Sequence, residues 1–352
     1  MVLGKVATGR DNNFNLIRML AAIAVLVSHA WPMTKGAAAA EPLVGIVGAT
    51  LGTLAVYVFF ATSGFLITAS LSRAASAPDF IATRALRLLP GLVVSVLLVA
   101  LVIGPVVTTL PTDAYLSAPE TWTFVLRNIT LAKCQYTLPG VFAPNPLPVI
   151  EGSMWTLIHE VACYAFVLAA GVAGLFAHRR ALIAALCAYG ALWMLAALAP
   201  SLPHRLNDWR MLSLPFVMGM AAWVWRYRLS LNAAILGALI VVAALTRHTP
   251  VAFPALAAAI TYATLWCAYI PGGRTRTYNR LGDYSYGLYL YAFPLQGLAV
   301  WLAGPMSPTA NIAMSLPAAL CCAVLSWHLI EKPALTLRYS RTRGRARRIA
   351  HS

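Results

Sequence analysis

Residues 88–110 read LLPGLVVSVLLVALVIGPVVTTL and contain no charged side chain. At 1.5 Å per residue, a helix of this length is long enough to cross a hydrocarbon core about 30 Å thick. A membrane-spanning strand is excluded, because barrel strands alternate in polarity over about ten residues. The stretch therefore predicts a transmembrane helix.

The same pattern recurs along the chain. Of its 352 residues, 60% are hydrophobic and 10% are charged, whereas a soluble globular domain has about 25% charged residues. Apolar runs bounded by charges, proline and glycine predict ten spans. They lie near residues 14–31, 44–71, 88–110, 154–176, 181–198, 211–225, 231–245, 251–270, 284–302 and 309–330. We expect an all-α, polytopic transmembrane bundle over residues 1–335 and a basic cytoplasmic tail over residues 336–352.

The net charge of +16 would suit a nucleic acid, but the basic residues stand at the ends of the apolar runs and in the tail. That distribution is typical of topology signals and of contact with membrane lipids, so no nucleic-acid partner is expected. With ten spans and a cytoplasmic N-terminus, 20 of the 26 Lys and Arg are cytoplasmic. The positive-inside rule therefore predicts two cytoplasmic termini and an outward-facing loop over residues 111–153.

Three common signals are weak or missing. The six cysteines give neither a disulfide framework nor a zinc spacing, so no metal site is expected. Lys5 and Arg10 precede an apolar run as in a secretory signal, but Arg18 interrupts that run, and we expect no cleavage. No internal repeat is evident, although repeats are common in secondary transporters.

Arg18 and His29 are ionisable residues inside the first predicted span, where a charge at the helix centre costs about 2.5–3.5 kcal/mol. Eleven residues separate them, which is about 16 Å and close to three turns, so both project from nearly one face. In one interpretation, Arg18 snorkels to the interface and His29 bonds to a neighbouring helix. In the other, His29 is a general base that takes the proton from an attacking sugar hydroxyl.

The segment SMWTLIHEVACY, which starts at Ser153, brings Glu160 into the fourth predicted span. Glu160 and Tyr164 lie four residues apart, and Ser153 and Trp155 precede them, so polar groups occupy two adjoining helix stripes. Glu160 is either a buried partner of an arginine or a residue of binding or catalysis. The sequence leaves both interpretations open.

Arg84 and Arg87 precede the third span. A spacing of three places both guanidinium groups on one helical face, where they can bind phosphate oxygens bidentately. As a bare pattern, two arginines beside a span are more often positive-inside anchors.

The last two predicted spans carry further polar residues. Tyr289 lies too far inside the ninth span to belong to an interfacial aromatic belt, so its hydroxyl needs a partner. Asp283 is expected to cap that helix. The sequence EKP at residues 331–333 predicts the end of the last helix.

Taken together, these motifs resemble those of the acyltransferase 3 family, which comprises membrane enzymes that O-acylate bacterial polysaccharides, lipopolysaccharide and related molecules. Five stretches occur in the family's order, between residues 14 and 333. They are FNLIR at 14–18 with Ser28 and His29, VFFATSGFLI at 58–67, RALRLLP at 84–90, GSMWTL at 152–157 with Glu160 and Tyr164, and SYGLYL at 285–290 with Phe293 and Pro294.

The resemblance implies a ten-span enzyme in which His29 is needed for transfer and Arg84 and Arg87 serve an acyl-coenzyme A donor on the cytoplasmic side. The chain departs from the family at two points. Many members have a histidine where this chain has Ala292, and the acid that some members pair with the first-span histidine has only Glu41 as a candidate here.

The expected function is therefore a membrane-bound O-acyltransferase of the bacterial inner membrane. It would transfer an acyl group, expected to be acetyl, from acyl-CoA to a hydroxyl of a surface polysaccharide, such as an exopolysaccharide, or of a lipid-linked sugar, without a tightly bound cofactor. His29 and Glu160 are the expected catalytic residues. The other expected site residues are Arg84, Arg87 and Arg18 for the donor, and Ser153, Trp155, Tyr164 and Tyr289 for the acceptor.

Two questions remain open at the level of sequence. His29 could deprotonate the acceptor or carry the acyl group transiently. A transporter of a sugar, lipid or acyl carrier could use the same intramembrane charges as a relay without any chemistry.

Overall fold

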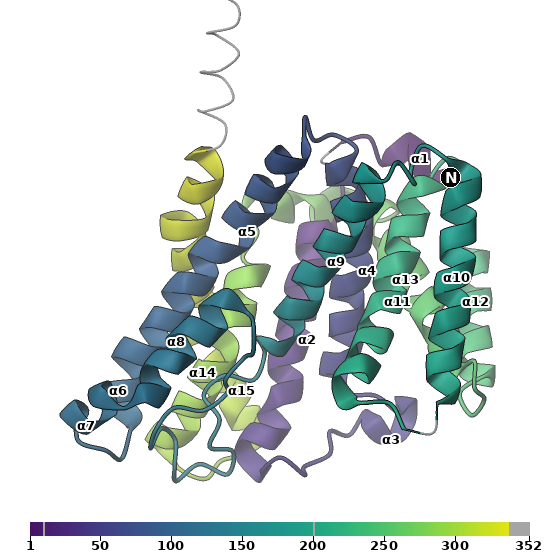
Figure 1. Ribbon diagram of the computed structural model, residues 1–352. Helices are drawn as coiled ribbons and strands as arrows, with labels where there is room; N and C mark the ends of the chain where they lie inside the picture. Colours follow the sequence, from purple (N-terminus) through teal and green to yellow (C-terminus); the bar gives the residue numbers. More distant parts are fainter. Residues whose placement is uncertain (10, 200, 338–352) are drawn as a thin grey trace, which may run out of the picture. The chain divides into compact units, whose positions relative to one another are not determined.

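The structure is a computed structural model that describes residues 1–9, 11–199 and 201–337. The described residues form helices and no sheet, which confirms the all-α class (Figure 1). The predicted basic tail lies outside the described residues from position 338 onward.

Fifteen α-helices occur in the described ranges, with π-helical turns at Val99–Ile103 and Trp327–Glu331 and a 3₁₀ segment at Gly273–Arg280. The α-helices are α1 (Leu3–Val6), α2 (Phe14–Lys35), α3 (Val44–Val47), α4 (Leu51–Leu71), α5 (Ala77–Leu98), α6 (Gly104–Val107), α7 (Thr112–Ser117), α8 (Pro119–Thr130), α9 (Trp155–Val172), α10 (Arg179–Leu198), α11 (His204–Val224), α12 (Ala233–Leu245), α13 (Ala252–Tyr269), α14 (Ser285–Ala303) and α15 (Pro308–Ser326).

Each predicted span coincides with a helix, but the number of membrane-crossing helices is not confirmed. Seven helices in the described part of the chain are long and apolar enough to cross a membrane. Helices α11 and α14 have the length and are more polar, and α12 has only 13 residues. Ten spans therefore remain a prediction.

Several predicted boundaries are displaced: α5 begins at Ala77 and α11 at His204, before the predicted residues 88 and 211, and two further boundaries are wrong for local reasons. The second span begins at Leu51, because the chain breaks after α3 at Gly48, whose φ of 75° is left-handed. The last helical stretch does not end at Pro333 but continues to Leu337. A π-helical turn precedes Pro333, and the altered hydrogen-bond register of such a turn accommodates a residue without an N–H.

The predicted outer loop over residues 111–153 is more ordered than its composition suggested. It contains α7 and α8, and the side chain of Asn128 is fully buried. The Asn128 amide donates to the backbone oxygen of Gln135 and accepts from its N–H. The same segment buries Tyr115, Phe124, Phe142 and Ile150, so side-chain hydrogen bonds and apolar packing together order it.

The chain divides into two compact units. Unit 1 consists of residues 1–18, 53–77 and 159–280, and its core includes Phe14, Phe65, Trp223 and Tyr269. Helices α4 and α11 cross closely in this unit, because a Cβ at Gly64 would collide with the backbone of α11. Small residues commonly allow such close approach between membrane helices.

Unit 2 consists of residues 19–52, 78–158 and 281–352, described as far as 337. Helix α14 is its core, with fourteen of its nineteen residues buried, and it packs along α15 (Figure 1). Gln296 on α14 donates to the backbone oxygen of Leu26 at 2.9 Å and to the Asn311 side chain at 3.0 Å. Hydrogen bonds therefore join α14 to α2 and α15 inside this unit.

Candidate functional site

His29 lies on α2, which is one continuous helix from Phe14 to Lys35. Its side chain is partly exposed, and its ring packs edge-on against Phe293 of α14, with 5.1 Å between ring centroids. Within the described residues, neither ring nitrogen has a hydrogen-bond partner. The imidazole is thus fixed by packing, while both nitrogens remain available for a reactant.

Ser28, the residue before His29, connects α2 to Glu41, the acid that the sequence offered as a candidate partner of His29. Glu41 is buried and accepts hydrogen bonds from the Ser28 hydroxyl and, at 2.7 Å, from the backbone N–H of Leu51. Its hydrogen bonds therefore hold Ser28 and the start of α4. Whether Glu41 pairs with His29 was left open by the sequence, and in the described chain the bonds of Glu41 go to Ser28 and Leu51 and not to His29.

The turn before α9 packs on the ring that contacts His29. A Cβ at Gly152 would collide with the Phe293 ring, so only glycine allows this contact. Glu151, one residue earlier, is completely buried, and within the described chain neither of its carboxyl oxygens has a hydrogen-bond partner. This burial raises the pKa of Glu151 well above its usual value.

Ser153 and Tyr289, both predicted at the acceptor site, bond to each other. The Tyr289 hydroxyl donates to the backbone oxygen of Ser153 at 2.5 Å and lies 2.6 Å from the Thr156 hydroxyl. The Ser153 hydroxyl donates to the backbone oxygen of Tyr289 at 3.2 Å. These contacts tie α9 to α14, and they provide the partner that the Tyr289 hydroxyl was expected to need.

Arg87 forms an ion-pair cluster. Its guanidinium pairs with Asp283 and lies 3.4 Å from the carboxylate of Glu331. The charged groups are mostly buried, and Arg87 also lies over the Trp327 ring at 5.5 Å. Asp283 accepts from the Ser285 hydroxyl as well, and the N-cap residue of α14 is Tyr284 and not Asp283 as the sequence predicted.

Arg84 differs from Arg87 although both stand on one helix. Arg84 is partly exposed and lies over the Phe80 ring at 6.0 Å. Arg18, the third basic residue predicted for the donor, is also partly buried on α2. Arg84 and Arg87 therefore have different neighbours: two carboxylates at Arg87, and the Phe80 ring at Arg84.

Glu160 belongs to unit 1, where it is the centre of a smaller polar cluster. It accepts a hydrogen bond from the Ser63 hydroxyl at 3.0 Å and another from the Tyr164 hydroxyl. Ser63 comes from the VFFATSGFLI stretch, so two of the quoted motifs meet here. The partners of Glu160 are hydroxyls, and its postulated pairing with an arginine is not among these bonds.

The residues that the sequence did not reveal are carboxylates and their hydroxyl partners. Asp283 and Glu331 looked like helix-end residues, and Glu151 looked like part of an exposed polar loop. No periodic pattern marks them. Asp283 and Glu331 acquire their role from a residue far away in the chain, since Arg87 is 196 residues from Asp283 and 244 from Glu331.

Comparison with known proteins places these motifs in a family. A model described as an acyltransferase domain matches residues 11–328. The chain is 30% identical over 345 residues to an O-acetyl transferase of Shigella phage Sf6, covering 93% of this chain and 97% of the relative. It is 27% identical over 373 residues to Nodulation protein 10 of Rhizobium leguminosarum bv. viciae, covering 95% and 96%. No solved structure matches it.

The chain therefore belongs to the acyltransferase 3 family. It is an integral membrane acyltransferase, and this class supersedes the transporter that the sequence left as an alternative.

Proposed function

We propose that the enzyme transfers a short acyl group, expected to be acetyl, from acyl-CoA to a hydroxyl of a surface polysaccharide or a lipid-linked sugar. The observation that carries the proposal is the environment of the His29 side chain. Its imidazole lies on an apolar helix, is partly exposed, is oriented by Phe293, and makes no hydrogen bond within the described chain. A histidine that served only packing would bond to a neighbouring helix.

In the proposed reaction, His29 takes the proton of the acceptor hydroxyl while the hydroxyl oxygen attacks the thioester carbonyl. The carbon–sulfur bond then breaks, coenzyme A leaves as a thiolate, and the imidazolium returns the proton to the sulfur. The alternative is an acyl-histidine intermediate, in which the imidazole nitrogen attacks first and the acceptor displaces it in a second step. Both routes give the same products.

For the donor, we propose that Arg84 binds a phosphate and that Arg87 is a positioning residue; Arg18, in unit 1, is a separate donor-binding residue in this proposal. Two carboxylates already surround Arg87, and their charge would oppose a phosphate at the same guanidinium. Arg84 is on the same helix and partly exposed. Arg87 would hold α5 in place through the residues beside α14 and α15, and thereby fix the direction in which Arg84 points.

For the acceptor, we propose that Trp155 contacts the sugar. It is partly exposed, and an indole provides a large amphipathic surface for a sugar ring. Ser153 and Tyr289 bond to protein groups, so they would shape this region. In unit 1, Glu160 would act as a supporting residue that holds Ser63 and the proposed acceptor residue Tyr164.

We further propose that the enzyme resides in a bacterial inner membrane with both termini in the cytoplasm, because 20 of 26 basic residues then lie inside. A single cysteine at Thr277, which is exposed, tests this orientation in a variant that lacks the native cysteines. A membrane-impermeant thiol reagent should leave it unlabelled in intact cells and label it after permeabilisation. Labelling in intact cells would refute the topology.

The decisive test of function uses the purified full chain, acetyl-CoA with a labelled acetyl group, and a panel of polysaccharides and lipid-linked sugars. Transfer of label to an acceptor hydroxyl supports the proposal, and donor hydrolysis alone contradicts it. Rapid denaturation at neutral pH without an acceptor separates the two routes, because only the covalent route leaves label on the protein and an acyl-imidazole would hydrolyse in acid.

A further inference from the structure

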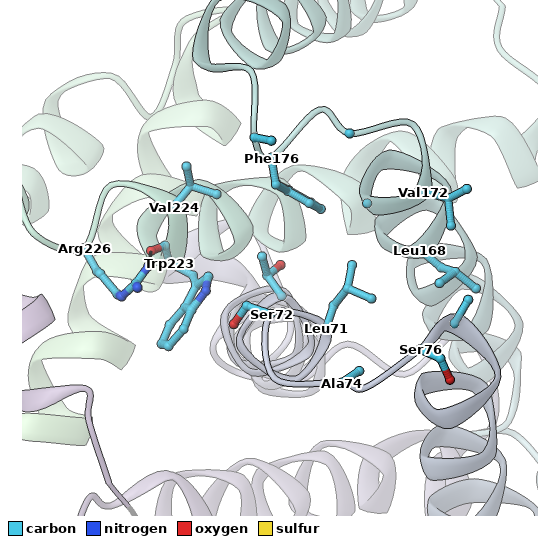
Figure 2. Close-up of a pocket in the computed structure, with 15 residues that line it drawn as sticks. Leu71, Ser72, Ala74, Ser76, Leu168, Val172, Phe176, Trp223, Val224 and Arg226 are labelled. Carbon is cyan, nitrogen blue, oxygen red and sulfur yellow. Dashed lines mark hydrogen bonds between the residues drawn. The ribbon is translucent and has the colours of Figure 1, made fainter.

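A cavity of about 500 Å³ opens at one end of unit 1, where α4, α9 and α11 end and turn (Figure 2). This end of the unit also carries the N-terminal helix, because Gly4 donates its N–H to the backbone oxygen of Arg226, one of the lining residues. The volume lies within the range of about 300–1,000 Å³ that is usual for small-ligand sites.

The cavity has two chemically different sides. Figure 2 shows Leu168 and Val172 of α9 on one side, and Trp223 and Arg226 on the other. Leu71, from the end of α4, lies between them. A ligand that fits both sides has an apolar part and a polar part, as an amphiphile does.

The polar side of the cavity presents Arg226, and a second guanidinium, that of Arg73, lies near the same indole although Arg73 is not itself a lining residue. Arg226 lies 4.2 Å from the Trp223 ring centroid and 4.6 Å from that of Tyr227, and it donates one hydrogen bond to the backbone oxygen of Trp223. Arg73 lies 5.9 Å from the same indole. A guanidinium has five N–H donors, so the Trp223 bond leaves most of those on Arg226 for a ligand.

No acid neutralises these two arginines within the described residues of unit 1. None of the residues lining the cavity is acidic. The acids of the unit are Asp11, Glu160 and Asp208; Asp11 pairs with Arg276, and Asp208 with His204. Glu160 binds hydroxyls. The cavity therefore combines positive charge with an apolar wall, which favours an anionic head group.

Capping of helix ends explains only part of this arrangement. The carboxyl ends of α4, α9 and α11 carry partial negative charge, and the bond from Arg226 to the Trp223 oxygen satisfies one such carbonyl. Capping would not, however, require a cavity, and it leaves Arg73 without a bonded carbonyl in the described chain. A ligand accounts for both features.

The apolar side continues onto a face that lipid can cover. Val172, which lines the cavity, is 73% exposed, and Phe166 and Val161 on the same helix are also exposed. Since α9 is one of the helices apolar enough to span a membrane, an acyl chain can run from the cavity along this face. A free nucleotide or a free phosphate would gain nothing from it.

We propose that this cavity binds one anionic phospholipid of the surrounding bilayer, with its phosphate at Arg73 and Arg226 and one acyl chain against Leu71, Leu168 and Val172. Basic pockets between membrane helices are known to bind anionic head groups. The site is independent of the transfer reaction, and it stands even if the proposed donor or acceptor is wrong.

Native mass spectrometry of the full chain tests the proposal, with phosphatidylglycerol and phosphatidylcholine of identical acyl chains as probes. The parent should retain one phosphatidylglycerol per chain in preference to phosphatidylcholine. In the double variant R73Q/R226Q, affinity should fall about thirtyfold, at about 1 kcal/mol for each arginine. The matched control is R274Q/R280Q, which removes the same charge from exposed arginines of the same unit, and should change affinity less than twofold.

Two further measurements probe the apolar wall of the cavity and the identity of its anion. Replacing Ala177, an exposed residue at the cavity wall, with Phe should fill the apolar side and displace the lipid without a change in melting temperature. Inorganic phosphate and coenzyme A should not compete with phosphatidylglycerol at equal concentration. The proposal would be overturned if R274Q/R280Q lost as much affinity for phosphatidylglycerol as R73Q/R226Q. It would also be overturned if A177F retained the lipid, or if coenzyme A or phosphate displaced it.

Discussion

Helices α12 and α14 show opposite relations between polarity and burial. Helix α12 consists only of Ala, Ile, Leu, Val and Gly, and none of its thirteen residues is buried. Helix α14 contains three tyrosines, a serine and a glutamine, and fourteen of its nineteen residues are buried. In a water-soluble protein the apolar helix would be buried and the more polar helix would be exposed. The apolar helix is exposed because lipid covers it, and the polar one is buried because its groups bond to protein.

This contrast indicates where function is to be sought in the protein. Residues on the exposed apolar faces can be exchanged for one another as long as they remain apolar. Most polar groups inside unit 2, in contrast, bond to a specific partner. In unit 2, His29 and Glu151 are ionisable side chains without a hydrogen-bond partner in the described residues, and packing does not explain their presence; the buried Ser95 hydroxyl also lacks a partner there but is neutral. The following predictions test this contrast, starting with the largest expected effect.

Replacing His29 with Ala should remove turnover and leave the fold unchanged. Loss of a general base costs about 10²- to 10⁴-fold in rate, and the imidazole makes no hydrogen bond in the described chain whose loss would destabilise the protein. The measurement is acyl transfer per correctly inserted molecule, together with the melting temperature. The matched control is His178→Ala on an exposed turn, which should keep full activity. Turnover of His29→Ala within a few fold of the parent would show that this polar group is only packing.

Replacing Arg87 with Ala should destabilise unit 2 by about 3–5 kcal/mol, because Asp283 and Glu331 would remain buried without their cation. Denaturation in detergent measures the loss. Arg84→Ala is the control on the same helix: it should lower donor affinity with a much smaller effect on stability. If the two variants lose the same stability, the proposed division between a positioning and a donor-binding arginine is wrong.

Replacing Glu151 with Gln should stabilise the protein near pH 8, because Gln cannot ionise. Holding a carboxyl neutral costs about 1.4 kcal/mol for each pH unit between its unfolded-state pKa and the pH or its folded-state pKa, whichever is lower. The folded-state pKa of Glu151 is raised by burial. Below the unfolded-state pKa of about 4.3, both states are neutral and there is no penalty. As the pH rises above it, only the unfolded state ionises freely, so the folded protein loses stability.

The measurement for Glu151 is the melting temperature of parent and variant between pH 4 and pH 8. The gain from Glu151→Gln should be small at pH 4 and increase with pH. Glu120→Gln, on the exposed start of α8, is the control and should show no such trend. A gain that is independent of pH would mean that Glu151 has a partner in the folded protein.

Exchanging apolar residues on α12 should have the smallest effect. Ile240 and Val241 are more than half exposed, so Ile240→Leu and Val241→Leu should each change stability by less than about 0.5 kcal/mol, as surface substitutions usually do. Activity should also remain at the level of the parent. A loss above about 1 kcal/mol, outside that usual range, would show that protein, and not lipid, covers this face.

Sequence alone predicted much of this architecture. Each predicted span is a helix, because a run of some twenty apolar residues has no other stable form in a bilayer. The motifs around His29, Arg84 and Glu160 also identified the acyltransferase family, since chemistry restricts which residues can stand there. The boundaries at Leu51 and Leu337 were missed because a left-handed glycine and a π-helical turn have no hydropathy signal.

What only the tertiary structure decided is which polar groups meet. The sequence presents Arg84 and Arg87 as equivalent, and the fold gives one of them two buried carboxylates. It suggested Glu41 as a partner of His29, and the fold places the Ser28 hydroxyl there instead. Periodicity determines which face of a helix is apolar, but a hydrogen bond depends on distances of about 3 Å between residues far apart in the chain, and only packing fixes those.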